Sequence, residues 1–181
     1  MGVLIAAVVL VGVLCVLDLL LTLGVIRRLR EHTTHLEGLL RAPRHGDGLP
    51  EIGNPVGEFT TTTVDGESVS QASLTGDTLV AFFSPGCEPC EAKLPDFLAY
   101  ARNIPGGPRQ VWAVVTGPAD KAGEMVDKLR PVVTTVMDGV DGPVSTAFQT
   151  SATPTFCLVD DAGRIAAAEF DFTVLPTPVR A

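Results

Sequence analysis

Two cysteines separated by two residues, Cys87 and Cys90, are the residues of this sequence best suited to chemistry. At positions i and i+3 of a helical turn, their Cα atoms would lie about 5–6 Å apart, within the range that a disulfide allows. The pair follows a short apolar run, residues 78–83, and opens a segment with helical spacing, residues 88–103. Unpaired N–H groups at a helix start favour a thiolate on Cys87, whereas Cys90, one turn further, is expected to be more buried and protonated. The pattern predicts a redox-active dithiol.

The neighbouring residues suit the same interpretation. Pro89 falls in the first helical turn, where a missing N–H costs little, and Gly86 permits a tight turn from strand to helix. One alternative is a structural zinc site, which would need Cys157 and a distant histidine as further ligands. Another is a pair of inert buried thiols, which would not require this strand–helix junction. We expect no metal and no cofactor beyond the dithiol itself.

The elements that must position the dithiol alternate along the chain. A β-hairpin is expected over residues 59–63 and 67–69, around the turn signal Asp65-Gly66. Strands and helices then follow in alternation, and a second hairpin closes the chain. The order predicts an α/β fold with a mixed sheet. The expected strands are residues 78–83, 110–116, 131–137, 155–159 and 165–170, and the expected helices are residues 88–103, 119–129 and 143–148.

Two segments resemble a known family. The segment FFSPGCEPCEAKLP resembles the active-site segment of thioredoxin-like proteins, with Pro95 where the family helix is kinked. The segment TSATPTFCLVDDAGRI resembles the second family signature, a cis-proline followed by a strand, a tight turn and an antiparallel strand. With the preceding hairpin and an apolar N-terminus, the resemblance narrows to the membrane-tethered TlpA/ResA-like disulfide reductases. The N-terminal organisation also resembles MauD-type proteins, which assist disulfide formation in methylamine dehydrogenase.

The resemblance implies a thioredoxin-like fold over about residues 50–170 and a role for each matching residue. Cys87 is the attacking thiolate, and Cys90 is the resolving thiol that releases the mixed disulfide. Pro154 would face the dithiol after a cis peptide bond, so that the backbone of Thr153 can pair with a substrate strand. The alternative for Pro154 is an ordinary trans turn proline. The implied partner is a protein disulfide.

One departure from the family pattern concerns proton transfer. Ala81 stands in the strand where thioredoxin relatives commonly have a polar or acidic residue, so Glu88 and Glu91 are the nearest candidates to accept the Cys90 proton. Both carboxylates oppose a thiolate on Cys87, which would raise its pKa and favour a reductant over a strong oxidant. The alternative for Glu91 is a solvated charge on the helix surface.

Two further features leave alternatives open. The C-terminal segment contains Pro176 and Pro178 and cannot form the amphipathic helix with which family members finish, so we expect a truncated C-terminal helix. Part of that sheet face would be exposed, or covered by the juxtamembrane helix or a partner. Cys157, in the strand after Pro154, is interpreted as a small buried apolar residue, with a third redox thiol as the alternative.

The N-terminus predicts a membrane anchor. Between residues 3 and 26, 20 of 24 residues are apolar, which as a helix spans about 36 Å, enough to cross a bilayer. Asp18 within it marks either a helix partner or proton site, or a carboxylate that its apolar neighbours outweigh. Arg27, Arg28 and Arg30 follow the span and favour a cytoplasmic domain by the positive-inside rule. The family resemblance instead predicts an extracytoplasmic domain, which is the orientation we expect.

Charge and length complete the prediction. From residue 46 onward the sequence has 18 acidic and 8 basic side chains, and the resulting net charge of −10 argues against nucleic acid as a partner. The expected partners are therefore a protein disulfide, the membrane and a membrane electron donor. The expected division is an anchor at residues 1–27, a juxtamembrane helix and linker at 28–57, a thioredoxin-like domain at 58–171 and a tail at 172–181.

The sequence thus predicts a membrane-tethered thiol–disulfide oxidoreductase that reduces or exchanges disulfides of an extracytoplasmic protein. A thiol peroxidase is one alternative, because Ser84-Pro85-Gly86-Cys87 loosely resembles the motif of peroxiredoxin-like proteins, which share the fold. The other alternative is a tethered, non-enzymatic assembly module that uses the acidic surface and the groove at Pro154.

Overall fold

The computed structural model describes residues 48–176 except 105, 106, 108, 109 and 140, together with residues 1, 2, 5, 10 and 12. The chain divides into two units, Met1–Pro43 and Arg44–Ala181, and the fold described below belongs to the second. The predicted juxtamembrane helix and nearly all of the predicted anchor, including Asp18, lie outside the described residues. Within the described part of the chain, no helix is long and apolar enough to cross a membrane.

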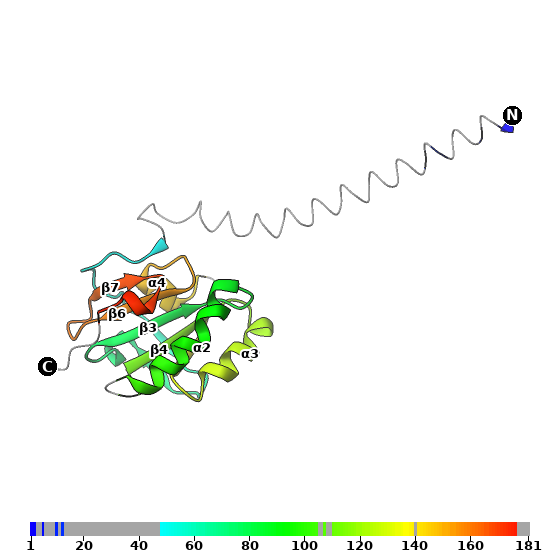
Figure 1. Ribbon diagram of the computed structural model, residues 1–181. Coiled ribbons are helices and arrows are strands. Elements are labelled where there is room, and N and C mark those ends of the chain that lie inside the picture. Colours follow the sequence, from blue (N-terminus) through cyan, green and yellow to red (C-terminus); the bar gives the residue numbers. More distant parts are fainter. Residues whose placement is uncertain are drawn as a thin grey trace. The chain divides into compact units, whose positions relative to one another are not determined.

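The core of the second unit is a five-stranded mixed sheet in the order β5-β4-β3-β6-β7 (Figure 1). β3 (Thr78–Phe83), β4 (Val111–Thr116) and β5 (Thr134–Asp138) are parallel to one another. β6 (Thr155–Val159) runs antiparallel to β3, and β7 (Ile165–Glu169) runs antiparallel to β6. All six residues of β3 are buried, as expected for a central strand with both faces covered.

Two helices cover one face of the sheet. α2 (Glu88–Asn103) connects β3 to β4, and α3 (Ala119–Leu129) connects β4 to β5. Both connections step in the same direction across the sheet, and right-handed crossovers then place both helices on the same face. Figure 1 shows α2 and α3 side by side in front of the strands. Leu79, Ala81 and Phe83 of β3 belong to the core cluster beneath them.

The opposite face is covered by smaller elements. α4 (Pro143–Phe148) packs there with the hairpin of β1 (Thr60–Thr62) and β2 (Ser68–Ser70), and the short η2 (Gln71–Ser73) follows the hairpin in the chain. Successive side chains of a strand point to opposite faces, so Val80 and Phe82 of β3 contribute to this second cluster.

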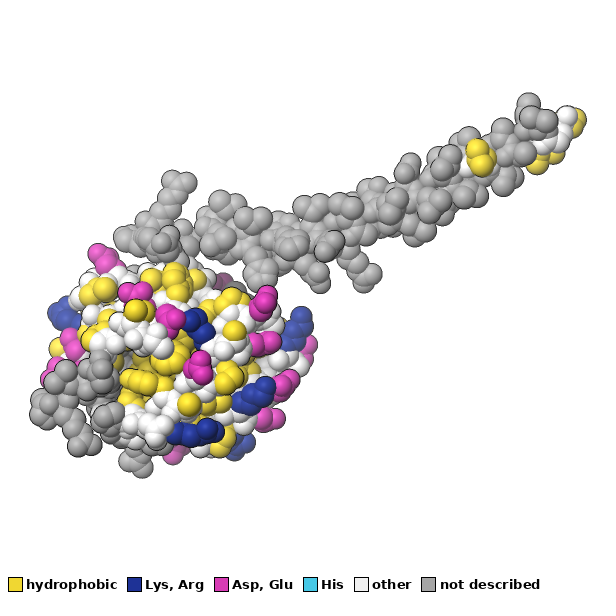
Figure 2. All heavy atoms as spheres, in the orientation of Figure 1, with side chains coloured by type: hydrophobic (Ala, Val, Ile, Leu, Met, Phe, Trp, Pro, Cys, Tyr) yellow, Lys and Arg dark blue, Asp and Glu magenta, His cyan; other side chains and the backbone are white. Residues whose placement is uncertain are grey.

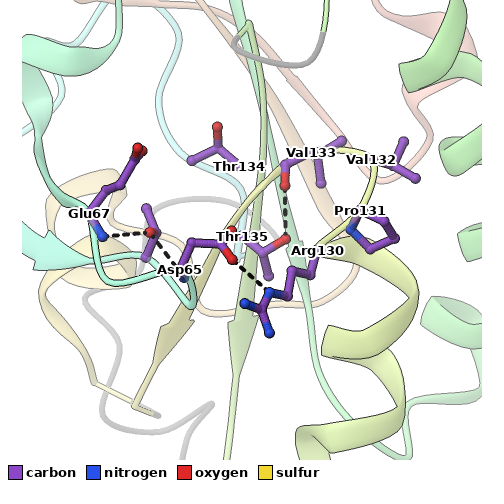
Figure 3. A pocket seen from close by; sticks show the side chains of 9 residues that line it. Asp65, Glu67, Arg130, Pro131, Val132, Val133, Thr134 and Thr135 are labelled. Atoms are coloured by element: carbon purple, nitrogen blue, oxygen red, sulfur yellow. Dashed lines mark hydrogen bonds and ion pairs between the residues drawn. The ribbon is translucent and has the colours of Figure 1, made fainter.

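The hairpin also meets the edge of the sheet. Its loop residue Val64 donates a backbone hydrogen bond to Thr135 of β5 at 2.9 Å, and Arg130 Nε donates to Asp65 Oδ1 at 2.6 Å. A small pocket lies between this loop and the turn after α3 (Figure 3). Because it lies at the start of β5, it is at the end of the sheet opposite the dithiol.

Residues 48–57, which their Pro and Gly content assigned to the linker, are bonded to the domain. Gly53 N–H donates to Ile165 O at 2.8 Å, and Val56 N–H donates to Gly163 O at 2.9 Å, along the outer edge of β7. Gly57 N–H donates to Ala147 O of α4 at 2.9 Å. Backbone hydrogen bonds do not depend on residue type, so the composition of this segment could not indicate them and indicated a linker.

After β7 the described chain ends in the short η4 (Phe172–Val174) in place of a full helix. Phe172 is buried and packs against Phe97, Tyr100 and Phe156, with ring centroids 5.3–6.0 Å apart. The segment that the sequence assigned to the tail therefore contributes one large side chain to the core under α2.

Most predicted elements agree with the observed ones, and the hairpins, five central strands and three helices are all present. The strand predicted over residues 131–137 begins only at Thr134, and this is a correction. Val132 and Val133 N–H both donate to Leu129 O at 2.9 and 3.0 Å, so these residues complete the turn at the end of α3. Their β-branched side chains favour a strand locally, and the helix end overrides that preference.

Candidate active site

The two predicted thiols lie where β3 gives way to α2, at the carboxyl edge of the parallel strands. Cys87 and Cys90 form a disulfide with their Cα atoms 5.2 Å apart, in agreement with the predicted spacing. Cys87 is the N-cap of α2 and is half-buried, whereas Cys90 is fully buried among apolar side chains such as Ala81 and Phe83. A substrate can therefore reach the sulfur of Cys87 more readily than that of Cys90.

Polar groups converge on Cys87 Sγ. The backbone N–H of Cys90 donates to Sγ at 3.3 Å, as a helix N-terminus does to its capping side chain. Thr153 Oγ1 lies 3.9 Å from the same sulfur, and the carbonyl oxygen of Thr153 lies 3.6 Å from it. When the disulfide is reduced, the N–H and the hydroxyl are placed to donate to a thiolate on Cys87.

The Thr153–Pro154 peptide bond is cis, as the resemblance predicted. Pro154 is buried, and the loop before it is fixed at both ends. Thr150 N–H donates to Ser145 O of α4 at 3.2 Å, and Thr155 Oγ1 donates to Ala152 O at 2.8 Å. The loop thereby brings the backbone of Thr153 beside the sulfur that a substrate would approach.

The remaining predicted residues of the site, Glu88, Pro89 and Glu91, are all exposed on the first turns of α2. Cys90 itself belongs to the apolar core cluster under α2 and α3. The structure thus brings Thr153 and Pro154 to the dithiol and leaves the two carboxylates in solvent.

A groove beside the dithiol was not foreseen from the sequence. Pro85 and Gly86 form one end of it, Leu94 and Met125 belong to its lining on α2 and α3, and Lys121 and Glu91 lie on its walls. Its walls come from two helices that are distant in sequence, so no local pattern could have indicated it. On the face seen in Figure 2, which carries these helices, acidic and basic side chains are interspersed.

Cys157 lies on the other face of the sheet from the dithiol. It is fully buried in the cluster that α4 covers, together with Val80 and Ala168. Burial raises the pKa of the Cys157 thiol far above its ordinary value. These observations match the prediction of a small buried apolar residue and exclude a direct reaction with the dithiol across the intact sheet.

A family model matches most of the domain that carries the dithiol. Residues 52–168, more than half of the chain, match the model described as the AhpC/TSA family. The chain belongs to the AhpC/TSA family. The matched range includes the dithiol, the loop before Pro154, β3 to β6 and all but the last residue of β7.

Solved structures confirm a thioredoxin-like fold. The thioredoxin domain of a thiol-disulfide oxidoreductase from Bacteroides vulgatus superposes with a TM-score of 0.53 at 22% identity, over 66% of this chain and 88% of that one. A thio-disulfide isomerase from Thermus thermophilus gives a TM-score of 0.55 at 19% identity, with coverages of 66% and 85%. A thiol:disulfide interchange protein from Chlorobium tepidum gives 0.53 at 20% identity, with coverages of 70% and 89%. The comparison with curated proteins found no match.

Proposed function

We propose that this protein is a membrane-tethered thiol–disulfide oxidoreductase of the TlpA/ResA type, which reduces a disulfide of an extracytoplasmic protein. The observation that carries the proposal is the asymmetry of the dithiol. Cys87 Sγ is accessible at a helix N-terminus beside the Thr153 backbone, and Cys90 is buried one turn behind it. This arrangement suits attack by one sulfur and resolution by the other.

The reaction balances without a cofactor. The Cys87 thiolate attacks one sulfur of the substrate disulfide, forms a mixed disulfide and releases the other substrate sulfur as a thiolate. Cys90 then loses its proton and attacks Cys87 Sγ, which releases the second substrate thiol and closes the Cys87–Cys90 disulfide. Two electrons pass from the dithiol to the substrate, and a membrane electron donor restores the dithiol.

The backbone of Thr153 is the proposed docking site for the substrate chain. Its carbonyl oxygen lies 3.6 Å from Cys87 Sγ, so an extended segment that pairs with Thr153 would carry its own disulfide to the attacking sulfur. Such pairing reads the backbone of the substrate, and side chains on either side of its disulfide would add selectivity.

The proposal is tested by reducing the protein and mixing it with insulin, whose interchain disulfides report reduction through precipitation of the free B chain. We expect turnover with dithiothreitol as the electron source and its loss in Cys87→Ala. A Cys157→Ala variant is the control, because that thiol is buried on the other face. Equal rates for wild type and Cys87→Ala would contradict the proposed function.

The tether and the compartment are part of the proposal. The apolar run at residues 3–26 supports an anchor, and the family resemblance favours export of the domain. Protease added to intact cells should then cleave the domain, and protection that is lost only on lysis would place it in the cytoplasm, as the three arginines after the run suggest.

Peroxide reduction is a second candidate, favoured by the match to the AhpC/TSA family and by the Ser84-Pro85-Gly86-Cys87 segment. In that reaction Cys87 would be oxidised to a sulfenic acid, and Cys90 would condense with it to form the disulfide and release water. Consumption of hydrogen peroxide by the reduced protein at a rate that exceeds insulin reduction would favour this candidate.

A further inference from the structure

The segment that enters the domain from its N-terminal side touches the loop that carries Thr153. Gly48 O accepts a hydrogen bond from Ser151 N–H at 3.2 Å and a second from Thr150 Oγ1 at 3.4 Å. The following Leu49 packs against the core cluster under α4, and Pro50 is buried. Residues 48–50 are therefore fixed to the domain on one side and bonded to the loop on the other.

The contact is close enough to require glycine. Gly48 has φ +83°, a backbone conformation that disfavours side chains, and a Cβ at this position would lie 2.8 Å from Ala152 Cβ and 3.1 Å from Ser151 Oγ. Carbon atoms pack at about 3.5–4.0 Å, and Ala152 Cβ has no rotatable bond with which to move away. A side chain at position 48 would push the two backbones apart.

From this contact the path to the dithiol is short. Ser151 and Ala152 directly precede Thr153, and Ala152 O accepts the hydrogen bond from Thr155 Oγ1 at the start of β6. Thr153 in turn places its carbonyl oxygen 3.6 Å from Cys87 Sγ. The loop is thus held by α4, by β6 and by Gly48. Among the hydrogen bonds that the described residues make to this loop, the one contact from outside the sheet and its helices is that of Gly48.

We propose that residues 48–50 are a positioning clamp on the loop at residues 150–154, and that Gly48 thereby sets how well the dithiol captures a protein disulfide. This inference rests on the proposed function, since it concerns the substrate chain that pairs with Thr153. A loop ordered in advance binds at a lower entropic cost, so loosening it weakens binding more than it slows chemistry. Gly48 also lies in the stretch that the sequence assigned to the linker, so the end of that stretch at residues 48–50 belongs to the proposed substrate site.

The experiment uses the full chain and compares Gly48→Ala with Gly53→Ala. Gly53 has φ +91° but open space around its missing Cβ, so its variant carries a similar backbone strain without the collision. For insulin, we expect Gly48→Ala to raise KM about tenfold with little change in kcat, and Gly53→Ala to leave both near wild type. Reduction of the small disulfide 5,5′-dithiobis(2-nitrobenzoate), which needs no backbone pairing, and the Cys87–Cys90 reduction potential should change far less than the insulin KM in Gly48→Ala, because the Cys90 N–H still donates to Cys87 Sγ.

Two additions separate the clamp from a merely structural effect. Ala152→Gly removes the atom that the new Cβ would meet, so it should restore much of the insulin KM when combined with Gly48→Ala. The amide of Ser151 should exchange its hydrogen faster in Gly48→Ala than in Gly53→Ala. If Gly48→Ala does not fold, Thr150→Val removes, without added bulk, the hydroxyl that donates to Gly48 O at 3.4 Å and to Ala152 O at 3.5 Å, and it should raise the insulin KM by itself.

The outcomes that would overturn the clamp are distinct from those that would overturn the function. Three outcomes would refute the clamp alone: an unchanged insulin KM in Gly48→Ala, an equal rise of the insulin KM in Gly53→Ala, or an equally large loss of activity toward the small disulfide. Where Thr150→Val replaces Gly48→Ala, an unchanged insulin KM in that variant would refute the clamp as well. A wild-type protein without Cys87-dependent insulin reduction would refute the proposed function, and the clamp with it.

Discussion

At the scale of single residues, the chemistry of the site depends on one helical turn. Cys87 and Cys90 have the same side chain and lie 5.2 Å apart at Cα, yet one is half-buried and the other is fully enclosed by apolar neighbours. The first sulfur also receives the Cys90 N–H. Position relative to the helix start therefore divides the two thiols into an attacking and a resolving partner.

This division predicts a trapped intermediate. Replacing Cys90→Ala removes the resolving thiol but leaves Cys87 and its hydrogen-bond donors in place, because the donor at position 90 is the backbone N–H. We expect reduced Cys90→Ala to accumulate a mixed disulfide with insulin, detected by mass spectrometry without reductant. The reverse variant, Cys87→Ala, is the control and should yield little adduct, since Cys90 is buried. Equal adduct in both variants would contradict the assignment of roles.

At the scale of elements, the segment after β7 covers part of the core under α2, as the C-terminal helix is expected to do in the family that the sequence resembles. Phe172 packs against the rings of Phe97 and Tyr100 on α2 and of Phe156 on β6. Lys93 Nζ of α2 donates to Asp171 Oδ2 at 2.6 Å, and Asp171 caps η4 through Thr173 N–H. One aromatic ring and one ion pair thus join the last described element to the helix that carries the dithiol.

The aromatic contact predicts a large loss of stability. Phe172→Ala should lower the free energy of unfolding by about 3 kcal/mol, because it removes a buried ring and leaves a cavity between α2 and β6. Val174→Ala, in the same η4 but exposed, is the matched control and should change it by less than about 0.5 kcal/mol. Urea unfolding measures both. Similar losses in the two variants would show that the tail does not cover the core.

The ion pair between Lys93 and Asp171 predicts a contribution to folding stability that is lost in acid. The hydrogen bond from Lys93, and then those from Thr173, lower the pKa of Asp171 from 3.8 to about 2. The folded state therefore binds this proton at lower pH than the unfolded state, so the stabilisation is present above about pH 4 and is lost between about pH 4 and 2.

Asp171→Asn should accordingly lower Tm relative to wild type at pH 6, and the difference should vanish by about pH 2. Thermal unfolding followed by circular dichroism at several pH values measures the change. Asp96→Asn, which alters an exposed carboxylate on α2, the helix that carries Lys93, is the control. A difference between wild type and Asp171→Asn that stays constant from pH 6 to pH 2 would contradict the role of this ion pair.

The elements and the dithiol could be predicted because their signals are local. The apolar run of β3, the spacing of Cys87 and Cys90 and the turn signals lie within a few residues of one another. Gly48, Phe172 and the groove between α2 and α3 could not be found in that way. Each depends on a contact between distant segments, and a glycine in a Pro- and Gly-rich stretch or a lone phenylalanine near a chain end carries no periodic pattern.

The pairing of Thr153 with Cys87 is an intermediate case. Spacing says nothing of a contact between residues so far apart, and only the resemblance to a family predicted it. The cis bond and the 3.6 Å distance from Thr153 O to Cys87 Sγ then agree with that prediction. Proximity in sequence suggested Glu88 and Glu91 as proton acceptors; both side chains are exposed in the structure, and that role stays a prediction.

At the scale of the whole molecule, charge determines which partners are attracted. From residue 46 onward, the 18 acidic and 8 basic side chains give a net charge of −10. Glu88 and Glu91 lie exposed within one helical turn of Cys87. The Debye length is about 30 Å at 10 mM salt and about 8 Å at 150 mM. The net charge of the entire domain therefore acts at low salt, whereas the charges nearest Cys87, these two carboxylates among them, act at physiological salt.

We therefore expect the reduced protein to prefer the dicationic disulfide cystamine over the dianionic disulfide of glutathione. The preference is the ratio of the two reaction rates, divided by the ratio that uncharged dithiothreitol gives with the same two disulfides. The preference should be largest at 10 mM salt and should shrink, without vanishing, at 150 mM, because nearby charges are screened least. Glu88→Gln combined with Glu91→Gln should remove most of what remains at 150 mM, whereas Asp160→Asn in the distant β6–β7 turn should not. Stopped-flow rates over a salt series measure the ratio. A ratio independent of salt would mean that the acidic surface does not select the partner, and the substrate would then be chosen by contacts at Thr153 alone.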